Sequence, residues 1–126
     1  MRQVFAEKDA VPGALEVTRV TADEVLTRLA RGEPLVFVDA RREEEWKASE
    51  EKLPGAFRVA PDALEEAETL PLVPRGRGIV TYCTCAHEAS AARVAHILIA
   101  RGHTDVHSLY GGMEAWRRAG GTFSPK

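Results

Sequence analysis

Two cysteines, a histidine and a glutamate lie within six positions, in the segment Cys-Thr-Cys-Ala-His-Glu from residue 83 to residue 88. A β-prone run, 79–82, precedes the segment, and a run of helix-forming residues follows it. A loop that bends from a strand into a helix can direct several backbone N–H groups toward one point. Such a cradle favours anions and lowers the pKa of a thiol held in it, so Cys83 is a candidate nucleophile.

Other uses of these side chains remain open. Free cysteines are most often small buried hydrophobic residues, and Cys83 at the end of a strand could be one. Cys85 could resolve an oxidised Cys83, or the two thiols and His87 could ligate a soft metal. Three ligands this close in sequence lack the separated pairs of structural zinc sites, and no fourth ligand is evident. We therefore predict no metal site.

Composition limits the class of protein. The 126-residue chain is 44% hydrophobic and 29% charged, as expected for one globular domain, and its formal net charge of -2 gives no basic field for nucleic acid. The amino terminus has no apolar stretch of signal length, and the longest aliphatic run, 97–100, is too short to span a bilayer. Two cysteines one residue apart form no framework of stabilising disulfides. The sequence predicts a cytoplasmic protein without nucleic-acid or membrane partners.

Strands and helices alternate along the predicted secondary structure. A capping box at Thr21 begins the first helix and Gly32 ends it. The expected strands are 15–20, 35–38, 57–60, 79–82 and 105–109, and the expected helices are 21–31, 42–48, 63–70, 89–101 and the segment after 111–112. This alternation predicts the α/β class, with a parallel sheet and right-handed crossovers. Ligands of such folds bind beyond the carboxyl ends of strands, where Asp39 and Cys83 are expected.

Several motifs, taken in order, resemble the rhodanese family from about residue 15 to residue 120. They are Asp39-Ala40-Arg41 with Glu45-Trp46, Leu53-Pro54-Gly55-Ala56, Tyr82-Cys83, and Gly111-Gly112-Met113-Glu114-Ala115-Trp116. The resemblance implies that residues 1–126 form a single rhodanese-like domain. It also implies a five-stranded parallel sheet flanked by helices on both faces, with an active-site loop over residues 83–88.

The resemblance further implies a sulfurtransferase that needs no cofactor. Cys83 would attack a small sulfur donor such as thiosulfate or a persulfide, hold the sulfur as a persulfide, and pass it to a thiol or small-protein acceptor. Backbone N–H groups of the loop would stabilise the negative sulfur. The residues expected to bind the substrate are Thr84, Cys85, Ala86, His87, Glu88, Asp39 and Arg41. The alternative role of Asp39 and Arg41 is a structural ion pair.

Two positions depart from the family pattern. Lys52 stands where the family usually has histidine, and Glu88 stands where many active members have arginine. An acid in the loop would repel a dianionic donor, since two charges about 4 Å apart at an effective dielectric of about 20 interact by roughly 4 kcal/mol. Glu88 could instead stabilise the amino terminus of the following helix. We hypothesise that Arg41 supplies the positive charge that the loop lacks.

Two other functions are compatible with the sequence. One is a non-catalytic rhodanese-like module that senses or binds sulfur or redox signals through Cys83 and Cys85. The other is phosphate chemistry, because the loop length also resembles that of arsenate reductases and cysteine phosphatases. Those enzymes need an arginine six residues after the cysteine, where this chain has Ala89. We therefore place phosphate chemistry below sulfur chemistry.

Overall fold

The computed structural model describes residues 17–61, 73–84 and 88–126, and it confirms the predicted α/β class. Its main sheet has five strands, and every neighbouring pair is parallel. In spatial order the strands are β1 (Thr18–Val20), β6 (Val106–Leu109), β5 (Gly78–Tyr82), β2 (Leu35–Asp39) and β4 (Phe57–Arg58). β5 is therefore the central strand, and all five carboxyl ends lie along one edge.

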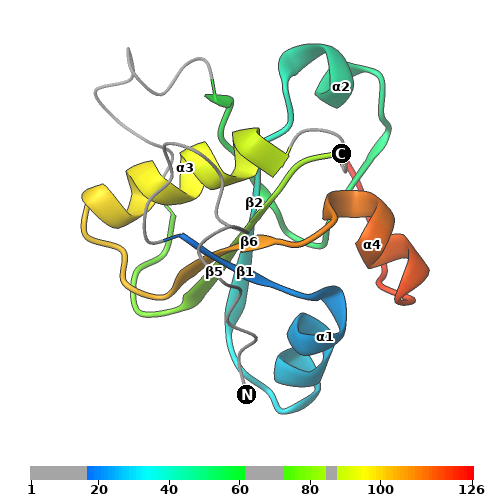
Figure 1. The fold of residues 1–126 in the computed structure, drawn as a ribbon. Helices are drawn as coiled ribbons and strands as arrows, with labels where there is room; N and C mark the ends of the chain where they lie inside the picture. Colours follow the sequence, from blue (N-terminus) through cyan, green and yellow to red (C-terminus); the bar gives the residue numbers. More distant parts are fainter. Residues whose placement is uncertain (1–16, 62–72, 85–87) are drawn as a thin grey trace.

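Helices cover both faces of this sheet, as predicted (Figure 1). They are α1 (Ala22–Ala30), α2 (Glu43–Lys47), α3 (Glu88–Ala100) and α4 (Gly112–Arg118). Successive side chains of a strand point to opposite faces. Val36 and Val38 of β2 accordingly pack with residues of α3, whereas Phe37 packs on the other face with Trp116 of α4, at a ring distance of 5.3 Å. The core thus has two layers, with the sheet between them.

Local sequence signals explain the ends of α1. The Thr21 side chain accepts a hydrogen bond of 3.1 Å from the N–H of Glu24, so the predicted cap is confirmed. The helix ends before Gly32, whose φ of +83° is a conformation that side chains other than glycine rarely adopt. Because its cap Thr21 directly follows β1, α1 starts at the carboxyl edge of the sheet.

A second, two-stranded sheet was not predicted. β3 (Glu51–Lys52) pairs antiparallel with β7 (Ser124–Pro125) near the carboxyl terminus of the chain. The Lys52 amine donates a hydrogen bond of 3.2 Å to the carbonyl of Ala56 and so spans the adjacent turn. The predicted helix 63–70 lies outside the described residues. Within the described ranges, no helix is long and apolar enough to cross a membrane.

Candidate active site

Cys83 is the first residue after β5, in the middle of the edge where the parallel strands end. Its carbonyl accepts a hydrogen bond of 3.0 Å from the N–H of Met113 in α4, and the carbonyl of Tyr82 accepts one of 2.8 Å from the N–H of Ala40 after β2. α3 begins at Glu88. The predicted position of Cys83, between a strand and a helix at the carboxyl edge, is confirmed.

The surroundings of the Cys83 thiol raise its pKa, whereas the sequence predicted a lowered one. The side chain is fully buried, with a relative exposure of 0%, and burial raises its pKa to about 12. A hydrogen bond from the Ala91 backbone opposes this shift, whereas the negative charges of Glu88, Glu45 and Asp39 increase it. At neutral pH the thiol is therefore predominantly protonated. Burial and the charges of Glu45 and Asp39 depend on residues far from Cys83 in the sequence, so the raised pKa was not predictable from the local motif.

This state predicts how alkylation of Cys83 depends on pH. Between pH 7 and pH 10 the rate with iodoacetamide should rise about tenfold per unit, because the thiolate fraction below the pKa rises tenfold per unit. The measurement uses Cys85→Ser, which leaves Cys83 as the chain's one cysteine, and follows the intact mass with time. A rate that reaches its plateau near pH 7 would show a low-pKa, accessible thiol and would contradict the buried state.

The described part of the loop contacts α2. The Thr84 hydroxyl donates a hydrogen bond of 2.9 Å to a carboxylate oxygen of Glu45. Glu45 was not predicted as a site residue. Its place in the Glu45-Trp46 pair of the family motif was the sequence signal that could have identified it. Cys85, Ala86 and His87 lie outside the described residues. The predicted cradle of their N–H groups therefore stays a prediction.

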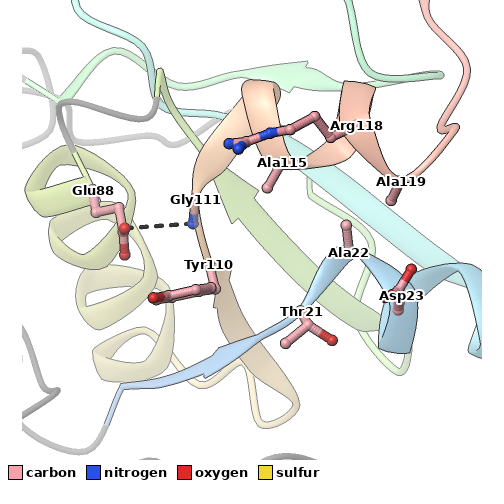
Figure 2. Close-up of a pocket in the computed structure, with 9 residues that line it drawn as sticks. All are labelled: Thr21, Ala22, Asp23, Glu88, Tyr110, Gly111, Ala115, Arg118 and Ala119. Atoms are coloured by element: carbon pink, nitrogen blue, oxygen red, sulfur yellow. Dashed lines mark hydrogen bonds between the residues drawn. The ribbon is translucent and has the colours of Figure 1, made fainter.

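The Glu88 side chain is directed toward the ends of β1 and β6. One carboxylate oxygen lies 3.1 Å from Nε of Arg19, and the other accepts a hydrogen bond of 3.4 Å from the N–H of Gly111 (Figure 2). Glu88 is also the first residue of α3, where an acid is favourable. These contacts support the structural role considered for Glu88, although its charge still contributes to the raised pKa of Cys83.

Asp39 and Arg41 form an ion pair in which both side chains are only 1% exposed. Nη2 of Arg41 lies 2.7 Å from Oδ2 of Asp39 and also donates a hydrogen bond of 2.9 Å to the carbonyl of Glu51. The Tyr82 hydroxyl donates a bond of 2.8 Å to the same carboxylate and accepts one of 3.1 Å from the N–H of Leu53. Burial and the neighbouring Asp39 raise the pKa of Tyr82. The contacts favour a structural ion pair over a role of Arg41 in donor binding.

Arg58 is a second cation at this edge that sequence reasoning missed. It is opposite Asp39 in the register of β4 and β2, donates a hydrogen bond of 3.2 Å to the Asp39 carbonyl, and lies 5.0 Å from the Trp46 ring. Burial, and secondarily the charge of Arg41, lowers its pKa. Only the order of the strands places Arg58 beside Asp39, so the sequence alone carried no signal for it.

Comparisons with known proteins agree with this architecture. The family model for the rhodanese-like domain matches residues 21–119. A rhodanese-like domain protein from Staphylococcus aureus is 25% identical, with a TM-score of 0.65, and the match covers 86% of this chain and 97% of that one. A search of curated proteins finds no match.

Two further solved structures share the fold at lower identity. A rhodanese-related protein from Thermoplasma volcanium is 16% identical, with a TM-score of 0.65 over 86% of this chain and 98% of that one. A protein of unknown function and possible tyrosine phosphatase from Rhodopseudomonas palustris is 24% identical, with a TM-score of 0.68. The match covers 98% of this chain and 99% of that one. Because the family model spans most of the sequence, this chain belongs to the rhodanese-like family.

Proposed function

We propose that this protein is a sulfurtransferase that carries a sulfane sulfur on Cys83. The observation that carries the proposal is the position of Cys83, at the carboxyl end of the central strand and before α3, in a chain of the rhodanese-like family. Sites of open α/β sheets form beyond this edge. Ala89 is exposed and leaves the chain without the arginine that phosphate chemistry requires at this position, so sulfur chemistry is preferred.

The transfer consists of two displacements at sulfur. In the first, the Cys83 thiolate attacks the outer sulfur of the donor, a new S–S bond forms, and the donor's S–S bond breaks. Its electron pair leaves on sulfite when the donor is thiosulfate, or on a thiolate when the donor is a persulfide. In the second, the acceptor thiolate attacks the outer sulfur of the Cys83 persulfide, and the electron pair of the broken bond returns to Cys83. No external oxidant or reductant is needed.

The charges around Cys83 favour one kind of donor. Glu88, Glu45 and Asp39 all lie close enough to raise the thiol's pKa, even though Asp39 pairs with Arg41 and Glu88 with Arg19. A dianion such as thiosulfate enters this field at a greater cost than a monoanionic or protonated persulfide. We therefore infer that a persulfide is the better donor. The buried thiol must become accessible for either one.

The test is the intact mass of the wild-type protein after incubation with each donor. We expect a gain of one sulfur atom, faster from a small-molecule persulfide than from thiosulfate at equal concentration, and loss of that atom when a thiol is added. Removing excess donor before adding the thiol ensures that the protein itself carries the sulfur. No gain from either donor would contradict the proposal.

A second candidate function is a redox or sulfur-binding module without turnover. The buried thiol with a pKa of about 12 favours it, because such a thiol is a poor nucleophile for turnover. The same mass measurement separates the two candidates. Loss of two hydrogens without a gain of sulfur would indicate a disulfide between Cys83 and Cys85 and would favour the redox module.

A further inference from the structure

A cavity of about 590 Å³ opens at the carboxyl ends of β1 and β6 (Figure 2). Its volume lies in the range of sites that hold small molecules. Ala22 of α1 and Ala115 of α4 form part of its apolar floor. Among the predicted site residues that the structure describes, Glu88 alone lines this cavity.

The cavity is adjacent to the candidate active site. Thr21 follows β1, Tyr110 follows β6 and Cys83 follows β5, and these three strands are neighbours in the sheet. Adjacent strands lie about 4.8 Å apart. Glu88, at the end of the active-site loop, lines the cavity and accepts a hydrogen bond from the N–H of Gly111, another lining residue. A ligand in the cavity therefore lies within a few strand spacings of the end of β5.

The walls carry opposite charges on separate elements. Arg118, which is exposed, extends from α4 past Ala115 toward Gly111, whereas the exposed carboxylate of Asp23 lies on α1 (Figure 2). The third charged wall residue, Glu88, is compensated by Arg19. Such a cavity suits a small ligand that carries both a carboxylate and an ammonium group, since each can meet an opposite charge.

Tyr110 adds an apolar surface beside these charges. Its side chain is 43% exposed and is the one large hydrophobic residue that is exposed among the described residues. Its ring lies 5.2 Å from the Arg19 guanidinium, which helps to hold it in place. One wall of the cavity is therefore a ring face, against which a short aliphatic side chain can pack.

We propose that this cavity binds the sulfur acceptor and that the acceptor is a small zwitterionic thiol of the amino-acid type. The inference rests on the proposed sulfurtransferase function. The acceptor's carboxylate pairs with Arg118 and its ammonium group with Asp23, while its thiol points toward Cys83 at the end of β5. Its thiolate then attacks the outer sulfur of the Cys83 persulfide, and the electron pair of the broken S–S bond returns to Cys83.

The experiment isolates the second half-reaction. Protein loaded with sulfur and freed of donor is mixed with four thiols, and loss of the extra sulfur is followed by intact mass at rising thiol concentration. The thiols are cysteine, with both charges, 3-mercaptopropionate, with the carboxylate, cysteamine, with the ammonium group, and neutral 2-mercaptoethanol. Rates are compared at equal thiolate concentration, because the four thiols differ in pKa. We expect saturation with cysteine at the lowest concentration of the four.

Two variants assign the charges separately. Arg118→Gln should raise the half-saturating concentration of cysteine and of 3-mercaptopropionate about tenfold, as expected for one lost charge-assisted contact, and leave cysteamine unchanged. Asp23→Asn should have the same effect on cysteine and cysteamine and leave 3-mercaptopropionate unchanged. Arg31→Gln and Glu44→Gln are the matched controls, because both side chains are exposed and lie outside the cavity. The controls should leave all four thiols unaffected.

The outcomes separate failure of this inference from failure of the proposed function. A protein that never gains sulfur refutes the sulfurtransferase function, and the acceptor site fails with it. A protein that gains sulfur and loses it to all four thiols at rates proportional to thiolate concentration, equally in Arg118→Gln, retains the function but overturns the acceptor site. Saturation by cysteine that neither variant changes also overturns it.

Discussion

Cys83→Ser is expected to lower kcat/KM for donor-dependent sulfur transfer by at least about a thousandfold, because a serine hydroxyl neither ionises near neutral pH nor forms a persulfide. The measurement is the steady-state formation of sulfite from thiosulfate, or of acceptor persulfide from a persulfide donor. The substitution replaces a buried thiol by a hydroxyl group of similar size, so the fold should persist. Far-ultraviolet circular dichroism and a cooperative thermal transition check that it does.

Cys85→Ser is the matched control for this prediction. It removes the other thiol of the same loop, and the persulfide mechanism predicts that it retains turnover within a few fold. Equal loss in both variants would indicate that the two thiols act as a redox pair, and retention of turnover in Cys83→Ser would refute the proposed role of Cys83. The pair of variants thus distinguishes a sulfur carrier from a disulfide switch.

Arg41→Ala is expected to lower the free energy of unfolding by about 3–5 kcal/mol, because it leaves the buried Asp39 carboxylate without its cation. The Tyr82 hydroxyl that donates to the same carboxylate cannot replace a positive charge. The variant also removes the hydrogen bond to the Glu51 carbonyl, which helps to hold β3 against the main sheet. Domains of this size are stable by roughly 5–15 kcal/mol, so the loss is a large share of the total. Urea denaturation followed by tryptophan fluorescence measures it.

Arg117→Ala provides the comparison for this effect. Arg117 also pairs with Glu51, but through side chains that are 50% and 38% exposed, and such exposed pairs stabilise a fold far less than buried ones. The double variant Asp39→Asn, Arg41→Gln should be more stable than Arg41→Ala, since it leaves no uncompensated charge. If Arg41→Ala is no less stable than Arg117→Ala, the Asp39 and Arg41 pair does not hold this edge together.

Features that depend on neighbouring residues were predictable from the sequence. The capping box at Thr21 and the glycine at position 32 set the ends of α1, and the apolar run before Asp39 formed the buried strand β2. Cys83 lies at the strand end where its β-prone approach and the helix formers after it predicted. These features follow from local propensity and from hydrophobic patterns that few alternative structures satisfy.

Features that depend on distant residues were not predictable in this way. The direction of Glu88 is set by Arg19 on β1 and the backbone of Gly111 after β6, two segments far from it in sequence. The raised pKa of the Cys83 thiol comes from burial between layers and from carboxylates on two helices and a strand. β3 and β7 pair across most of the chain, and Ser124–Pro125 has no strand-like pattern.

Because the Cys83 thiol is buried, the proposed reaction requires that the thiol first becomes accessible to the donor. A sulfur atom with no exposed surface reacts with a donor only after the groups that cover it shift, and the bond between Thr84 and Glu45 is one described contact next to it. Loading of sulfur is therefore expected to be slow relative to its removal, because the persulfide extends beyond the position of the thiol. The two half-reactions can be timed separately in the mass measurement.

The location of the transferred sulfur tests the central claim most directly. Wild-type protein is loaded with a persulfide donor, blocked with iodoacetamide and digested with trypsin, which leaves both cysteines on the peptide between Arg77 and Arg93. Fragmentation between Cys83 and Cys85 then shows which residue carries the extra sulfur. The proposed mechanism predicts that the sulfur is on Cys83 and is lost from it when a thiol is added before blocking. Extra sulfur on Cys85 alone, or on neither residue, would contradict it.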